Sequence, residues 1–183
     1  MDTCRLLTSR LELIAANREL VHADRYARNL LPGLLEAGVP PEWPPPLNDN
    51  STLEWTLNYI GSHPDELCWL MWYFILNPSG NGRVVIGVGG FRGAPTSEGC
   101  VEVGYALLEA YQRKGFATEA TNELIRWAFG HPTVRRVAAE TYPHLRQSIR
   151  VLEKAGFSYI GSNTESLTIR FELTKEDWEN YHL

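Results

Sequence analysis

A short basic loop with one glycine stands between an apolar, strand-like run and a helix-like run. The loop and the helix start read Gln-Arg-Lys-Gly-Phe-Ala-Thr-Glu-Ala over residues 112–120. The first N–H groups of a helix lack intrahelical acceptors and lie at the positive end of the helix dipole, so they can bind an anion. Gly115 allows an anion to approach the main chain closely, and Arg113 and Lys114 add positive charge beside it. The pattern predicts a diphosphate-binding site.

Strands and helices on both sides of this loop must position it. Hydrophobic patterning predicts strands at residues 10–15, 67–76, 83–91, 100–108, 135–141, 157–161 and 167–173, and helices after residue 17, after residue 51, at 117–129 and at 148–155. A turn at residues 77–82 joins the second strand to the third, and the strands between residues 67 and 108 predict an antiparallel meander. We expect an α/β (α+β) fold with a mixed, mostly antiparallel sheet of about seven strands flanked by helices.

Length, charge and cysteine usage limit the classes of function. The 183 residues suit one domain over 1–183, and the net charge of −5 disfavours sequence-independent nucleic-acid binding. No apolar run approaches the ~20 residues that cross a bilayer, so no membrane partner is expected. The cysteines Cys4, Cys68 and Cys100 are odd in number and widely spaced, which disfavours a disulfide framework or a zinc site. A cytoplasmic protein without a bound metal is the expectation.

Two motifs in a fixed order carry a family resemblance. The pattern Gln/Arg-x-x-Gly-x-Gly/Ala is matched at residues 112–117, and Ser-Ile-Arg-Val-Leu-Glu-Lys-Ala-Gly-Phe follows at 148–157. Together they resemble the GNAT superfamily of acetyl-CoA-dependent N-acetyltransferases. The second motif and the opening Arg-Leu-Glu-Leu-Ile at 10–14 are similar to the RimJ/RimL-like branch, the ribosomal-protein N-terminal acetyltransferases. The resemblance implies a V-splayed mixed sheet, acetyl-CoA as cosubstrate and a primary amine as acceptor.

The same resemblance implies a set of cofactor-binding residues. Main-chain N–H groups from residue 112 to residue 118 would hold the CoA diphosphate, and residues 107–109 would pair with the pantetheine arm like an added strand. Ser148 would lie near the thioester sulfur or the arm, although a serine that caps a helix start is an equal alternative. The implied residues are Leu107, Leu108, Glu109, Gln112, Arg113, Lys114, Gly115, Phe116, Ala117, Thr118 and Ser148.

Two residues are candidates for catalysis. Attack on a thioester requires a neutral amine, and a carboxylate, or a water that it holds, can take the proton from the ammonium form. Glu102 is the candidate, because it lies on the strand that leads to the basic loop; a solvent-facing strand carboxylate is the alternative. The departing thiolate needs a donor, and the position where many family members have a tyrosine holds Leu152. The resemblance to the RimJ/RimL-like branch, whose members also lack this tyrosine and use a serine, implies Ser148 as the donor.

The acceptor side is less defined. Trp43 lies in a proline-rich segment at 40–46, and a surface loop of this kind has little core to offer. Trp43 is expected to line or cover the acceptor site, with burial in the core as the alternative, whereas Trp69 and Trp72 are expected in the core. The acceptor is a protein N-terminus or a small-molecule amine, and a homodimer is left open. A non-catalytic acyl-CoA-binding module is the alternative function.

Overall fold

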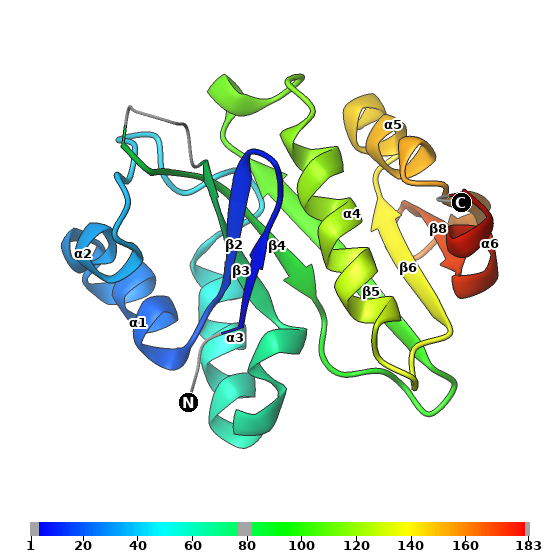
Figure 1. Cartoon of the computed structure of the whole chain (residues 1–183), viewed down its shortest axis with the longest axis horizontal. Coiled ribbons are helices and arrows are strands. Elements are labelled where there is room, and N and C mark those ends of the chain that lie inside the picture. Colours follow the sequence, from blue (N-terminus) through cyan, green and yellow to red (C-terminus); the bar gives the residue numbers. More distant parts are fainter. Residues whose placement is uncertain (1–3, 77–81, 182–183) are drawn as a thin grey trace.

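The computed structural model describes residues 4–76 and 82–181, and its centre is one sheet of eight strands (Figure 1). The strands are β1 (Arg5–Leu7), β2 (Leu11–Ala15), β3 (Met71–Leu76), β4 (Val84–Phe91), β5 (Cys100–Leu107), β6 (Arg136–Thr141), β7 (Ser158–Asn163) and β8 (Thr168–Thr174), in the order β1-β2-β3-β4-β5-β6-β8-β7. Every neighbouring pair is antiparallel except β5 with β6. The expected mixed, mostly antiparallel sheet and its β3-β4-β5 meander are confirmed.

The sheet differs from the prediction in two details. β1 has three residues, too few for the alternation of apolar and polar side chains to be recognised. The expected strand at 67–76 begins only at Met71, because residues 64–69 form a 3₁₀ helix, η2 (Pro64–Trp69). The turn expected at 77–82 falls mainly on residues 77–81, which lie outside the described residues.

The strand β5 pairs with a different neighbour along each half of its length. Residues 103–107 pair with β4, whereas residues 100–102 pair with β6. Beyond Glu102, β5 and β6 therefore separate, and the sheet opens in a V at this point (Figure 1). Among the described strands, none pairs with the β6-facing edge of β5 over residues 103–107, so this edge can accept an extended ligand.

Helices cover both faces of the sheet. They are α1 (Arg18–Tyr26), α2 (Leu31–Leu35), α3 (Asn50–Ser62), α4 (Phe116–Phe129), α5 (Arg146–Lys154) and α6 (Lys175–Tyr181), with the short 3₁₀ helices η1 (Arg28–Leu30), η2 and η3 (Glu109–Tyr111). The side chains of Asn17 and Asp49 accept N–H bonds and begin α1 and α3. No helix in the described ranges is both long and apolar enough to cross a bilayer.

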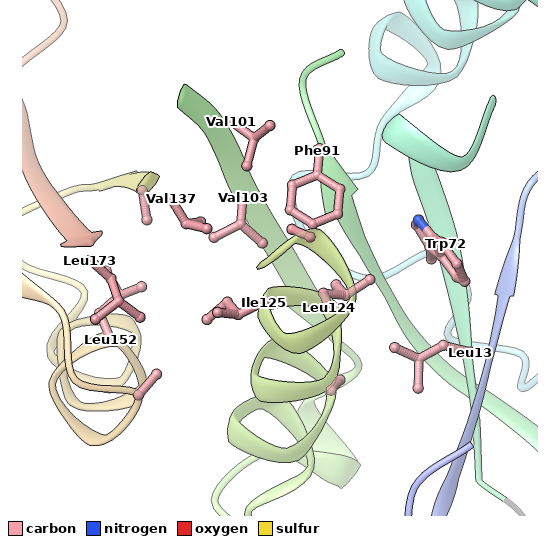
Figure 2. Packing of buried hydrophobic residues seen from close by; sticks show 14 of the residues in the cluster. Leu13, Trp72, Phe91, Val101, Val103, Leu124, Ile125, Val137, Leu152 and Leu173 are labelled. Atoms are coloured by element: carbon pink, nitrogen blue, oxygen red, sulfur yellow. The ribbon is translucent and has the colours of Figure 1, made fainter. Parts of the chain in front are cut away.

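The core consists of two clusters, one on each face of the sheet. The first contains residues of α4, α5 and α6, and the second contains residues of α1, α2 and α3. Figure 2 shows Leu124 and Ile125 of α4 in the first cluster, with Trp72 of β3 and Val103 of β5. Because Leu124 and Ile125 are fully buried, the second half of α4 is anchored in this cluster against the sheet.

Trp43 is a core residue. Its side chain is 5% exposed and packs in the second cluster, and its indole N–H donates to Asp24 Oδ1 over 2.9 Å. Asp24 is fully buried and also accepts from Tyr73 Oη at 3.1 Å and from Arg28 Nε at 3.2 Å. The prediction that the proline-rich segment contributes little to the core is wrong. The buried Asp24 carboxylate on α1 accepts the hydrogen bond of the Trp43 indole N–H, so the ring can be buried.

The expectation about cysteine pairing is also wrong. Cys4, just before β1, forms a disulfide with Cys68 in η2, with the two Cα atoms 6.2 Å apart. The pair is 64 residues apart in sequence, and only the fold brings it within bonding distance. Cys100 is free and buried in the core.

Candidate active site

The loop between β5 and α4 presents the start of a helix to solvent. α4 begins at Phe116, and its N-cap residue, Gly115, has a left-handed φ of 83° and makes no side-chain capping bond. Arg113 is also left-handed, with φ of 59°, and residues 113–115 are exposed. Left-handed residues in such a loop turn successive N–H groups toward one concave point, where an anion can bind. Glycine at the N-cap keeps the approach to these groups free of a Cβ atom.

Two side chains in the loop turn back toward the chain that precedes it. The N–H of Gln112 donates to Glu109 O over 3.1 Å, and its side-chain Nε2 donates to Leu107 O over 3.0 Å. Lys114 Nζ donates to Ala110 O over 2.7 Å. Gln112 was expected to offer its main-chain N–H to a diphosphate, but that donor already has an acceptor. The candidate set of main-chain donors is therefore narrowed to residues 113–118.

The turn between β1 and β2 braces this loop. Glu119, in the first turn of α4, accepts from Thr8 Oγ1 at 2.6 Å, from Ser9 Oγ at 3.0 Å and from the Arg10 N–H at 2.9 Å. The Arg10 guanidinium binds Glu119 Oε2 at 2.6 Å, donates to Lys114 O over 3.1 Å and lies 4.4 Å from the centre of the Phe116 ring. The brace fixes the direction of the first turn of α4.

Glu119 is ionised in this brace. Partial burial acts to raise the pKa of its carboxyl, but the hydrogen bonds from the β1–β2 turn outweigh burial and lower the pKa below its ordinary value. Arg10 and Glu119 each lie in a motif noted in the sequence, but their pairing was missed. They are 109 residues apart, and neither motif indicates that the two side chains meet.

The three residues expected along the pantetheine arm differ in their surroundings. The N–H of Leu108 donates to Ile86 O of β4 over 2.9 Å. Because N–H groups alternate in direction along a strand, the N–H of Leu107 points to the opposite side, where β5 has separated from β6. Glu109 begins η3 and is exposed. Of the three, Leu107 is the residue whose N–H direction suits an added strand.

Ser148 lies in the first turn of α5 and contacts β5. The N-cap of α5 is Leu145, so Ser148 does not cap this helix. The Ser148 Oγ lies 3.2 Å from Tyr105 Oη, and Ser148 O accepts from the same phenol at 3.1 Å. Burial raises the pKa of Tyr105 to about 12, and the hydrogen bond to Ser148 offsets only part of this effect. Tyr105 was missed because its partner comes from a distant helix.

Glu102 is held between two arginines. Its Oε1 lies 3.0 Å from Arg92 Nε, and its Oε2 lies 3.6 Å from Arg170 Nη1, with 23% of the side chain exposed. It is therefore neither a plain solvent-facing carboxylate nor a free base. Each carboxylate oxygen faces a guanidinium, and the Arg170 guanidinium is shared with Glu140 at 3.4 Å and Glu172 at 3.2 Å.

The site is built around β5. Glu102 and Tyr105 lie on β5, Leu107 ends it, the 113–118 loop follows, and Ser148 reaches it from α5. Trp43 does not join this group, because its side chain is buried in the second core cluster. Within residues 4–76 and 82–181, no group of three or more His, Cys, Asp or Glu side chains is arranged to hold a metal ion.

Comparisons with known proteins agree with this geometry. The sequence profile of the acetyltransferase (GNAT) domain matches residues 10–158. An uncharacterized N-acetyltransferase of Bacillus subtilis strain 168, YjdG, is 38% identical over 73 residues, which are 40% of this chain and 44% of YjdG. The aligned part thus spans less than half of that relative's length.

Two solved structures share the fold. Ribosomal-protein-S5-alanine acetyltransferase from Vibrio fischeri has a TM-score of 0.62 and 20% identity, covering 96% of this chain and 98% of its own. The microcin C7 self-immunity acetyltransferase MccE, in complex with acetyl-CoA and AMP, has a TM-score of 0.61 and 14% identity, covering 91% and 93%. Since the domain profile covers well over half of the residues, the chain belongs to the GNAT acetyltransferase family.

Proposed function

We propose that this protein transfers the acetyl group of acetyl-CoA to a primary amine by direct attack of the amine on the thioester. The observation that carries the proposal is the exposed start of α4, where Gly115 leaves the N–H groups uncapped, directly after the unpaired edge of β5. A diphosphate fits the first feature, and an extended arm fits the second. GNAT domains use acetyl-CoA as the cosubstrate, which contains both parts.

In this proposal each part of the site has one task. Main-chain N–H groups of residues 113–118 bind the diphosphate, and the Leu107 N–H orients the arm along β5. Glu102 holds a water molecule that takes the proton from the amine and passes it to solvent, since two arginines already bind the carboxylate. Ser148 donates a hydrogen bond to the thiolate as the carbon–sulfur bond breaks. Acetyl-CoA supplies the acyl group, and no covalent acyl-enzyme is involved.

The acceptor in this proposal is a protein N-terminus or a small-molecule amine. The fold shared with a ribosomal-protein-alanine acetyltransferase supports the first choice and the RimJ/RimL-like branch. The continuous sheet and the extent of the profile match support one GNAT domain over residues 1–183. Homodimerisation stays a prediction, which sedimentation of the purified protein tests.

A non-catalytic acyl-CoA-binding module is the second candidate. The observation that favours it is the side chain at position 152, because Leu152 is 1% exposed and has no proton to donate where many relatives have a tyrosine. Release of free CoA in the presence of a panel of amines and peptides, with mass spectrometry of the products, separates the two. Acetylated products support the enzyme. Acetyl-CoA that binds but is never consumed contradicts it and supports the module.

The cytoplasm is the proposed location, because acetyl-CoA is made and used inside cells. A reducing compartment would hold Cys4 and Cys68 as thiols, whereas the structure joins them. Rapid alkylation in intact cells, followed by mass spectrometry, distinguishes the two states. Alkylation of both Cys4 and Cys68 supports a cytoplasmic protein, and an intact Cys4–Cys68 disulfide contradicts it.

A further inference from the structure

Tyr105 and Ser148 connect β5 to α5 at the opening of the sheet. Tyr105 lies three residues beyond Glu102, the last residue of β5 that pairs with β6. Its phenol oxygen is 3.1 Å from Ser148 O and 3.2 Å from Ser148 Oγ. An arm that enters at the 113–118 loop and runs back along β5 passes Leu107 first and reaches Tyr105 next. The two hydroxyl groups therefore lie toward the reactive end of the arm.

The directions of these hydrogen bonds can change without movement of any heavy atom. A carbonyl oxygen only accepts, so in one arrangement the Tyr105 O–H donates to Ser148 O and the Ser148 O–H donates to the phenol oxygen. In the other arrangement, the phenol O–H donates to Ser148 Oγ, and the Ser148 O–H is free to rotate and donate to a different acceptor. The two acceptor distances differ by only 0.1 Å, so rotation about the two C–O bonds exchanges the arrangements.

The phenol does not pass its proton to sulfur. Burial raises the pKa of Tyr105 to about 12, whereas an ordinary thiol has a pKa of about 8.5. Proton transfer from the phenol to the thiolate is therefore unfavourable, and solvent water can supply the proton that the sulfur takes up. What the hydroxyl pair can offer during bond cleavage is a hydrogen bond to developing negative charge.

We propose that Tyr105 is a positioning residue whose O–H binds Ser148 Oγ, so that the Ser148 O–H is directed at the departing thiolate. The proposal rests on the acetyl transfer proposed above. The amine nitrogen forms a bond to the acyl carbon, the carbon–sulfur bond breaks, and its electron pair stays on sulfur, which accepts the Ser148 hydrogen bond. The proton lost by the amine goes to water, and water later protonates the sulfur. Tyrosine and serine keep their own protons throughout.

The experiment measures the pKa of the CoA thiol when CoA is bound, from the ultraviolet absorbance of the thiolate. A donor aimed at sulfur lowers this pKa, and loss of one neutral hydrogen bond raises it by about one unit. We expect Tyr105→Phe and Ser148→Ala to raise it and to lower kcat about tenfold, with KM for acetyl-CoA unchanged. Ser148→Thr keeps the hydroxyl and is expected to keep the wild-type thiol pKa.

Tyr59→Phe is the matched control, because that phenol donates to Glu66 and its ring packs against the second core cluster, whereas Tyr105 packs against the first. It is expected to change neither quantity. The proposal is overturned if Ser148→Ala leaves the thiol pKa of bound CoA at the wild-type value, or if Tyr105→Phe binds CoA normally and matches the control. Failure of the wild-type protein to acetylate any amine would instead refute the proposed function, because bound CoA would still report the thiol pKa.

Discussion

Gly115→Asp tests the anion site at the N-cap of α4. The new Cβ would lie 3.3 Å from Arg10 Nη2, which is the flexible end of a side chain, so steric conflict alone is modest. The φ of 83° adds a backbone cost of about 1–2 kcal/mol for a residue other than glycine. The larger effect is charge: two like charges about 4 Å apart near a protein surface repel by about 4 kcal/mol.

A repulsion of this size corresponds to a loss of about a thousandfold in affinity for CoA. Gly115→Ala carries the backbone cost without the charge, and we expect its affinity to stay within about tenfold of wild type, since the strain is present in free and bound protein alike. Isothermal titration calorimetry with CoA measures both. Gly33→Asp adds the same charge at a helix glycine with no atom within 4 Å of its Cβ position, and serves as the control. CoA affinity of Gly115→Asp equal to that of the control would refute the assigned loop.

Three further predictions concern other parts of the structure. Glu119→Gln should weaken CoA binding and destabilise the fold at neutral pH, because it loses the charged brace with Arg10. Folding lowers the pKa of Glu119, so its contribution to stability is present above the ordinary glutamate pKa of about 4.3 and is lost as the pH falls through the lower folded value. The denaturation midpoints of wild type and variant should therefore converge in acid. A difference that stays constant with pH would contradict the brace. Glu102→Gln should lower turnover and alter its pH profile while CoA affinity is unchanged, and an unaltered profile would remove Glu102 from proton transfer. Cys68→Ser should lower the free energy of unfolding of the oxidised protein by about 4 kcal/mol, the entropy of a loop closed over 64 residues, in urea denaturation; equal midpoints with and without reductant would show that the bond does not form.

The parts of the fold that follow a local pattern could be predicted from the sequence. α4 was expected at 117–129 and spans Phe116–Phe129, because its apolar face and the preceding glycine are both local signals. Asn17 begins α1 as a side-chain cap for the same reason. The loop before α4 was found in this way as well, since strand, basic residues, glycine and helix follow one another directly.

The parts that depend on distant residues could not be predicted. The brace of Glu119 by the β1–β2 turn, the Tyr105–Ser148 contact and the Cys4–Cys68 bond each join segments more than 40 residues apart. Trp43 shows the opposite error, in which a local signal misled. Proline predicted an exposed segment, but burial against α1 decided the position of the indole.

The central claim is that the main-chain N–H groups of residues 113–118 bind a diphosphate. Amide signals in a nitrogen–proton correlation spectrum, recorded as CoA or ADP is added, test it directly. The claim predicts that the largest shifts fall on residues 113–118, and that the amide of Gln112, already bonded to Glu109 O, shifts less. If saturating ligand shifts the signals of other amides but leaves the signals of residues 113–118 unchanged, the claim is contradicted.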